Sequence, residues 1–419
     1  MTAITSITAQ NTMEVTAVQD ILPEIVKAQI DAVVGDIGVD VAKTGMLHTS
    51  EIIEVVTNEI REHNFPVVVD PVMVSKGGAP LLKPEAVTTL VKKLLPLTTV
   101  ITPNAMEAEA LAGLKVKSLE EAKTAAKRIA ELGPKAVVIK GGHTSEEKAI
   151  DVLYSNGDFK IFESERIETK TTHGSGCTFA SAIAAELAKG RSIVDAVAAS
   201  KEFITKAIKF GLSIGHGFGP VNSMASLYNA AEKYAINENM KEAAEILENC
   251  PEIVNIIPEV QMNMAMALPY ACTCLDVMAI PGRIVRMGKR VRVASCPEFG
   301  ASNHVARAIL SLMKYEPAIR AALNLKYSES LVRICEKLGL ITSFYDRKEE
   351  PAEIKMIEGA TISWGVEQAI KRVGRVPSVI YHTGDVGREP MIILFGRTVV
   401  EVAKVAVEIA KEYSPPHAF

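Results

Sequence analysis

The chain has 419 residues, which is long for one hydrophobic core, so we expect two domains. Apolar residues make up 48% of it and charged residues 23%, a globular composition that excludes a disordered chain. A formal charge of −4 argues against a protein that coats nucleic acid, and no apolar run reaches the roughly 18 residues that a membrane span needs. The first residues lack the pattern of a secretory signal, and six irregularly spaced cysteines do not form a disulfide framework. We therefore expect a cytoplasmic protein.

The first half alternates short apolar runs with amphipathic segments. Strands are predicted at residues 32–34, 67–69, 100–102 and 136–140, and helices at residues 50–63 and 119–132. This alternation is typical of a parallel sheet covered by helices on both faces. A β-hairpin is predicted around Asn156-Gly157, between residues 151–154 and 159–162.

The second half begins after a helical segment at residues 228–249. We place the boundary near residue 240, which gives domains at residues 1–240 and 246–419. The second domain mixes helices with short strands, predicted at residues 305–313, 328–338, 378–382, 391–395 and 399–411. It is therefore expected to be a smaller α/β domain.

A glycine-rich motif, Thr172-His-Gly174-Ser175-Gly176-Cys177, directly precedes a helix of small residues at 179–189. Glycines at this place let backbone N–H groups turn toward an anion, and the helix N-terminus adds partial positive charge. The motif predicts a site for a transferring phosphoryl group. Close packing of the helix on the sheet is the alternative.

Two strand ends add to this prediction. Asn104 and Glu107 follow one strand, three residues apart, a spacing that can hold Mg²⁺ through its waters or simply cap a helix. Lys140 and two glycines end another strand, at the edge where ligands bind in open α/β sheets. A lysine there can reach phosphates, although most such lysines are solvated.

With these motifs the first half resembles the hydroxymethylpyrimidine (phospho)kinases of the ribokinase superfamily. The matching stretches are residues 8–12, 43–47, 70–73, 102–107, 140–143, 172–177 and 217–220. The resemblance implies a ribokinase-like three-layer domain with a parallel sheet. It also implies two phosphorylations of 4-amino-5-hydroxymethyl-2-methylpyrimidine, with ATP and Mg²⁺. A pyridoxal-kinase-like enzyme is an alternative, since some relatives share the Gly-x-Gly-Cys motif.

The resemblance assigns roles to single residues. Gln10 would pair with the aminopyrimidine edge, and Met46 would pack on its ring. Cys177, at a helix N-terminus, would have a lowered pKa and accept the hydroxyl proton. The remaining assignments are substrate binding by Asp70 and Lys140, Mg²⁺ binding by Asn104 and Glu107, and an anion hole formed by Gly174, Ser175 and Gly176. Packing or turn formation is the alternative for Met46, Asp70 and Cys177.

The start of the chain departs from the family pattern. By the resemblance, Met1 falls near the family's second strand, about 30 family residues with a glycine-rich loop are absent, and the sheet would show an unpaired edge. We therefore expect the 419-residue chain to be a poor kinase.

The second half contains three polar stretches, at residues 279–292, 296–304 and 381–390. The first holds five positive charges in the ten residues that begin with Arg283, and the second ends at His304. Arginine binds phosphate bidentately, and histidine or aspartate can serve as an acid, a base or a metal ligand. A solvated hairpin and a helix cap are the alternatives for the first two stretches.

These stretches resemble the ThiN-type thiamine-phosphate synthase domain. The resemblance implies that the pyrimidine pyrophosphate is joined to thiazole phosphate, giving thiamine phosphate. Arg283 and His304 would be catalytic, with His304 orienting or protonating phosphate oxygens. Asp385, Arg388 and Glu389 are second choices. An inactive kinase fused to a thiamine-phosphate sensor is the alternative. We expect small-molecule substrates, no nucleic acid or membrane partner, and a homo-oligomer.

Overall fold

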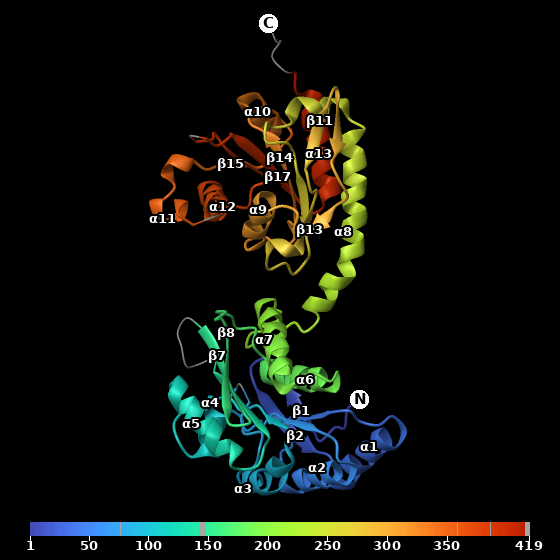
Figure 1. The fold of residues 1–419 in the computed structure, drawn as a ribbon, viewed down its shortest axis with the longest axis vertical. Helices are drawn as coiled ribbons and strands as arrows, with labels where there is room; N and C mark the ends of the chain where they lie inside the picture. Colours follow the sequence, from blue (N-terminus) through green and yellow to red (C-terminus); the bar gives the residue numbers. More distant parts are fainter. Residues whose placement is uncertain (76, 142–147, 358, 386, 415–419) are drawn as a thin grey trace. The chain divides into compact units, whose positions relative to one another are not determined.

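The computed structural model describes residues 1–75, 77–141, 148–357, 359–385 and 387–414 (Figure 1). The chain divides into two compact units, Met1–Ser226 and Leu227–Phe419. The predicted boundary near residue 240 falls inside helix α8 (Ala225–Glu248), whose buried side chains pack in the core of the second unit. Within the described ranges, no helix is long and apolar enough to cross a membrane.

The first unit is built on a six-stranded sheet. Its strand order is β3 (Ala42–Thr44), β4 (Val67–Val69), β5 (Val100–Ile101), β6 (Ala136–Gly141), β7 (Lys148–Ser155) and β8 (Asp158–Glu165). Strands β3 to β6 are parallel. Strand β7 is antiparallel to β6 and forms the predicted hairpin with β8. The predicted strands at residues 67–69, 100–102 and 136–140 are confirmed.

Both faces of this sheet are covered, because successive side chains of a strand point to opposite sides. Val67 and Val69 belong to one core cluster and Val68 to another. The first cluster includes residues of α2 (Ser50–His63) and α5 (Leu119–Ala130). The second includes residues of α6 (Ser175–Ala188) and α7 (Ile193–Lys209). The three-layer α/β prediction is therefore confirmed.

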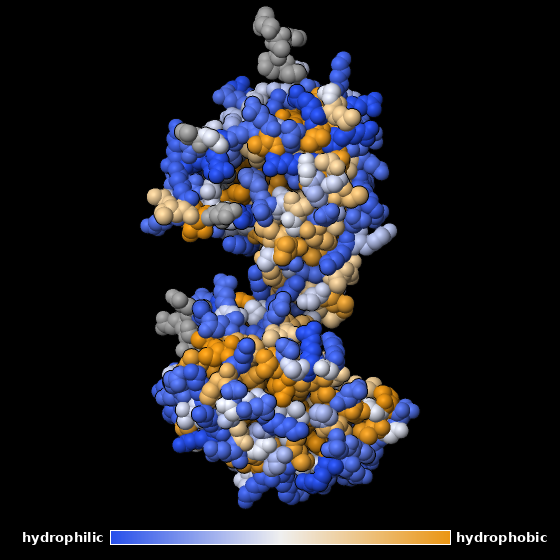
Figure 2. Space-filling view, in the orientation of Figure 1, coloured by the Kyte–Doolittle hydropathy of each residue, from blue (hydrophilic) through white to orange (hydrophobic). Residues whose placement is uncertain are grey.

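The strand predicted at residues 32–34 is wrong, because these residues lie in helix α1 (Pro23–Asp36). Three apolar residues do not distinguish the two periods, and Pro23 at the first turn is a helix-start signal. The preceding strands β1 (Ser6–Gln10) and β2 (Val15–Asp20) form a separate antiparallel pair. Apolar side chains reach the surface of the first unit (Figure 2). In and around β1, β2 and α1, the exposed apolar residues include Ile4, Ile7, Met13, Leu22, Ile25 and Ile37.

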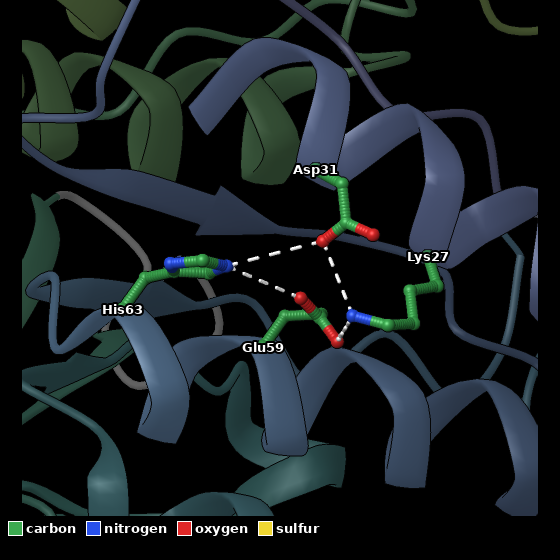
Figure 3. Close-up of polar contacts among 4 residues, drawn as sticks. All are labelled: Lys27, Asp31, Glu59 and His63. Atoms are coloured by element: carbon green, nitrogen blue, oxygen red, sulfur yellow. Dashed lines mark hydrogen bonds and ion pairs between the residues drawn. The ribbon is translucent and has the colours of Figure 1, made fainter. Parts of the chain in front are cut away.

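Four polar side chains connect α1 to α2 (Figure 3). The Lys27 ammonium lies 2.7 Å from the buried Glu59 carboxylate and 3.2 Å from Asp31, and His63 lies 3.4 Å from the other Glu59 oxygen. Asp31, Glu59 and His63 place their ligand-type atoms within 4.8 Å of one another. Because Lys27 bonds to both carboxylates and supplies positive charge itself, we interpret the group as an ion-pair network between two helices.

The second unit has a mixed seven-stranded sheet. Its strand order is β13 (Glu298–Phe299), β10 (Val277–Ala279), β9 (Met264–Ala267), β14 (Ala321–Lys326), β17 (Met391–Gly396), β16 (Val379–His382) and β15 (Thr342–Phe344). Within it β15 and β16 pair in parallel and the other neighbours are antiparallel. The helices packed with it are α9 (His304–Met313), α10 (Glu329–Lys337), α12 (Ala360–Val373) and α13 (Val399–Glu412) (Figure 1).

Candidate functional site

The carboxyl ends of the parallel strands bring three predicted residues of the first unit together. Asp70 follows β4, Asn104 follows β5, and Lys140 lies near the end of β6. The Lys140 ammonium donates to the Asp70 carboxylate at 2.8 Å, and Asp70 is only 2% exposed. Asn104 pairs with Lys140 through a backbone bridge. The buried Asp70–Lys140 ion pair is therefore the electrostatic centre of this site.

The glycine motif places the start of α6 against that ion pair. Gly174 precedes the helix with a φ of 77°, a left-handed conformation that favours glycine. A Cβ atom on Gly176 would lie 3.1 Å from the Lys140 ammonium and 3.5 Å from the Asp70 carboxylate. Glycine at 176 thus lets the helix N-terminus and the Lys140 cation face the same space, which is the arrangement that an anion needs.

Cys177 differs from its prediction. Its side chain is still reached by solvent, but the protein atoms on its other side exclude water and raise the pKa of the thiol. The charges of Lys43 and Lys140 lower this pKa, whereas Asp70 raises it further. The predicted lowering of the Cys177 pKa is therefore wrong. The helix N-terminus alone would favour a thiolate, but desolvation and the Asp70 carboxylate outweigh it.

Asn104 and Glu107 form a capping box at the start of α4 (Ala105–Ala112). The Asn104 side chain accepts the Glu107 N–H at 2.9 Å, and the Glu107 carboxylate accepts the Asn104 N–H at 2.8 Å. Burial raises the pKa of Glu107, opposed by the charge of Lys140. The capping alternative is confirmed. Mg²⁺ binding by these residues stays a prediction. Their chemistry fits it, because a carboxylate has about four lone-pair sites, and a nearby cation stabilises the charged form of a buried carboxylate.

An open pocket of about 350 Å³ lies beside the glycine motif. Its lining comprises Thr8, Gln10, Asn11, Thr12, His173, Ile214 and Pro220. Gln10 therefore lies at a pocket, as a substrate-binding residue must. Met46 is not among the lining residues, and its carbonyl accepts the Thr5 hydroxyl at 2.7 Å, so its role as a wall for the ring stays a prediction.

The 217–220 motif borders this pocket through Pro220. A Cβ atom on Gly217 would lie 2.1 Å from the Thr12 carbonyl oxygen, so only glycine lets the loop pack on Thr12, two residues after the end of β1. The Phe218 N–H donates to the same carbonyl at 2.9 Å. The loop thus fixes the strand end that carries Gln10. Of the matched stretch at 140–143, residues 142 and 143 lie outside the described residues.

In the second unit the basic stretch forms a hairpin of β11 (Ile284–Met287) and β12 (Arg290–Val293), which confirms the hairpin alternative for most of it. Arg283, just before β11, has a φ of 72°. A left-handed conformation at a non-glycine residue is strained, and such strain concentrates at functional sites. The Arg283 guanidinium donates to the Val260 carbonyl, which holds it beside the hairpin.

His304 occupies the first position of α9, and its Nε2 atom is buried without a hydrogen-bond partner. Burial lowers its pKa to about 4, with further lowering by the charges of Arg347, Arg283, Arg388 and Arg307. His304 is therefore neutral at pH 7 and, without a bound anion, cannot protonate a phosphate oxygen as the sequence suggested. It can orient one.

The residues of the third polar stretch, 381–390, differ in their relation to His304. Arg388 joins the charges around His304. Asp385 instead lies 3.9 Å from the Lys355 ammonium, and its backbone pairs with that of Arg388. The Glu389 carboxylate accepts the N–H groups of Glu259 and Val260, at 2.7 and 2.9 Å. Glu389 therefore fixes the loop that binds Arg283.

Two of the four arginines around His304 were not among the predicted site residues. Arg307 follows His304 by three residues on α9, a spacing that places both on one side of the helix and could have revealed it. Arg347 lies in a 3-10 turn (Arg347–Glu349), and nothing in its local sequence marks it. Together the four guanidiniums and a neutral histidine suit a phosphate or pyrophosphate group.

Both units match known families. Residues 1–222 match the family model of phosphomethylpyrimidine kinase, and residues 239–408 match that of thiamine-phosphate synthase ThiN. The first part is 45% identical over 232 residues to the hydroxymethylpyrimidine/phosphomethylpyrimidine kinase of Bacillus subtilis, covering 55% of this chain and 86% of that protein. The second is 44% identical over 176 residues to the thiamine-phosphate synthase ThiN of Methanothermobacter thermautotrophicus, covering 42% of this chain and 93% of that protein.

A solved structure also resembles the first unit. It is an ADP complex of Bacillus subtilis pyridoxal kinase, 44% identical, with a TM-score of 0.51. The similarity covers 54% of this chain and 87% of that one.

Proposed function

The chain belongs to the phosphomethylpyrimidine kinase family over residues 1–222 and to the ThiN family over residues 239–408, and from this premise we propose how its two sites work. It is a bifunctional enzyme of thiamine biosynthesis. The kinase half phosphorylates hydroxymethylpyrimidine and its phosphate at the expense of ATP. The synthase half joins the resulting pyrophosphate to thiazole phosphate, giving thiamine phosphate. The main support for this proposal is that each family match falls on a unit with its own anion-binding side chains.

In the kinase half, Lys140 and the N-terminus of α6 would bind the transferring phosphoryl group, where catalysis rests on positioning and electrostatics. Glu107 and Asn104 would hold Mg²⁺ through its waters, and this ion neutralises phosphate charge when bound. Cys177 carries its proton at rest, because its pKa is raised by burial and by Asp70. We therefore assign uptake of the hydroxyl proton to the Cys177–Asp70 pair rather than to a preformed thiolate: the Cys177 thiol gives its proton to the Asp70 carboxylate as its sulfur accepts the proton of the substrate hydroxyl.

In the synthase half, the arginines around His304 would bind the charge of the leaving pyrophosphate and of the thiazole phosphate. Arg283 is held in a strained conformation next to this group, which supports a catalytic role for it. Neutral His304 would orient a phosphate oxygen through a hydrogen bond. The aminopyrimidine supplies electrons that expel pyrophosphate before the thiazole nitrogen attacks, so the site must also exclude water.

Separate assays on the full chain test this proposal. With hydroxymethylpyrimidine, ATP and Mg²⁺, mass spectrometry should detect the pyrimidine pyrophosphate. With preformed pyrimidine pyrophosphate and thiazole phosphate, it should detect thiamine phosphate. Tight binding of thiamine phosphate without its formation would favour a sensor instead.

Pyridoxal is the competing kinase substrate, because one solved structure that resembles the first unit is described as a pyridoxal kinase. We expect kcat/KM to be higher for hydroxymethylpyrimidine than for pyridoxal. The reverse order would assign the first unit to pyridoxal.

Self-association is a further proposal, supported by the exposed apolar side chains around β1 and α1. Light scattering of the purified chain should give a mass above that of one copy, 45.1 kDa.

A further inference from the structure

A second buried histidine lies near His304 in the synthase half. His382 ends β16, is 3% exposed, and packs its ring against Tyr345 with centroids 5.1 Å apart. The Gly384 N–H donates to its Nδ1 atom at 3.2 Å. Because Nδ1 accepts this hydrogen bond, a neutral His382 must carry its proton on Nε2. That Nε2 atom is buried and has no hydrogen-bond partner among the described residues.

Three buried nitrogens without partners come from three different elements: His382 Nε2, His304 Nε2 and Arg347 Nε. They share surroundings, since Arg347 lowers the pKa of both histidines and His304 lowers that of His382. Buried polar atoms are normally satisfied, so three nitrogens without partners in one charged place point to a missing acceptor. The buried Glu350 carboxylate acts on the same Tyr345 ring, but its Oε1 atom also has no hydrogen-bond partner within the described ranges, so it does not supply that acceptor. Because Arg347 and the other arginines around His304 are positively charged, the acceptor that suits this place is an anion.

We propose that the Nε2–H of His382 donates a hydrogen bond to a phosphate oxygen of the substrate bound in the synthase half. His382 thus acts as a fixed neutral donor, held in one tautomer by Gly384 and in one orientation by Tyr345. Burial, then Arg347 and His304, lower its pKa to about 3, so the donor is present throughout the neutral range. The identity of the ligand rests on the proposed synthase function, whereas the tautomer and the anion binding do not.

Nitrogen NMR of the full chain, labelled in its eight histidines, tests the tautomer directly. The His382 signal, assigned by its loss in His382→Asn, should report Nε2–H and unprotonated Nδ1 from pH 5 to pH 8. Inorganic pyrophosphate, used as the probe, should shift that Nε2–H signal. An Nδ1–H tautomer, or a signal that pyrophosphate leaves unchanged, overturns the proposal.

Two substitutions separate anion binding from packing. His382→Asn keeps an acceptor near Nδ1 for the Gly384 N–H but lacks the distal donor. His382→Gln reaches the Nε2 position with an amide donor but loses the acceptor near Nδ1. In the synthase assay, we expect His382→Asn to raise KM and the inhibition constant of pyrophosphate by about tenfold to a hundredfold, with His382→Gln closer to wild type.

The opposite order, with His382→Asn close to wild type and His382→Gln impaired, would show that His382 only supports the Gly384 loop, and the proposal would fall. Thermal unfolding of each variant identifies any that does not fold, and the NMR titration of wild type then decides. If pyrophosphate shifts the His382 signal while the chain makes no thiamine phosphate, the anion site stands and the proposed synthase function fails.

Discussion

The two units place charge at their sites in opposite ways. In the first, Lys140 is already neutralised by the buried Asp70, and Glu107 adds a second carboxyl group nearby. In the second, four arginines surround His304, a histidine that burial keeps neutral. An anionic ligand of the first site must therefore compete with the Asp70 carboxylate for Lys140. A ligand of the second site instead brings negative charge to the arginines and to buried nitrogens that have no hydrogen-bond partner among the described residues. We therefore expect the ion pair of the first site to contribute to the stability of the folded unit, and the arginines of the second site to contribute mainly to ligand binding.

Breaking the Asp70–Lys140 pair tests its contribution to stability and should have the largest effect. Lys140→Met leaves Asp70 buried without its partner, which costs about 3–5 kcal/mol of stability, and kinase activity should be lost. Chemical denaturation would measure the change. The double variant Asp70→Asn/Lys140→Met should recover much of this stability but not the activity. Lys93→Met, which removes an exposed pair with Glu54, is the control and should change little. Additive effects of the two site substitutions would contradict the pairing.

Removing one arginine from the second site should impair catalysis more than folding. Arg283→Gly and Arg283→Ala both remove the guanidinium, and each should weaken transition-state binding by about 3–4 kcal/mol, by analogy with loss of an oxyanion donor. Because glycine favours the left-handed conformation at φ 72°, the glycine variant should be about 1 kcal/mol more stable than the alanine variant. Synthase kinetics and denaturation measure the two effects. Equal stabilities would argue against backbone strain, and unchanged kinetics against a catalytic Arg283.

Acid should weaken the second unit through its buried histidines. The folded pKa values of about 4 for His304 and about 3 for His382 lie below the ordinary value of 6.5. The unfolded chain therefore binds these protons first, so their contribution to stability is complete above pH 6.5 and declines as pH falls toward 4. The melting temperature of this unit should fall in that window, and less so in His382→Asn. An equal fall in wild type and variant would contradict the assignment to His382.

Cys177 provides the mildest test. Its alkylation by iodoacetamide should be slow at neutral pH, with a midpoint above the ordinary pKa of 9.0. Asp70→Asn removes a charge that raises this pKa, so the midpoint should move down. A wild-type midpoint below 9.0 would contradict the raised pKa of Cys177, and a midpoint below neutral pH would restore the preformed thiolate.

Local patterns predicted the elements whose sequences are periodic, such as α2, and the Val-rich strands β4 and β6. Strands β9 and β10 escaped prediction because their Met and Ala residues favour helices in isolation. They become strands through pairing with their neighbours in the sheet.

The sites show the same limit. The motifs identified Asp70 and Lys140, but 70 residues separate them, and only the parallel sheet makes them an ion pair. The raised pKa of Cys177 depends on Asp70 and on burial, neither of which is visible locally. Arg347 and the tautomer of His382 likewise depend on contacts made by the fold.

The most direct test of two independent sites in one chain is a mixing experiment. Hydroxymethylpyrimidine, ATP, Mg²⁺ and thiazole phosphate would be supplied to wild type, to Lys140→Met, to Arg283→Gly and to an equal mixture of the two variants, with thiamine phosphate measured by mass spectrometry. We expect product from wild type, almost none from either variant, accumulation of pyrimidine pyrophosphate with Arg283→Gly, and recovery of product in the mixture. Failure of the mixture, when each variant still performs its intact half-reaction, would contradict independent sites. So would full activity of either variant alone.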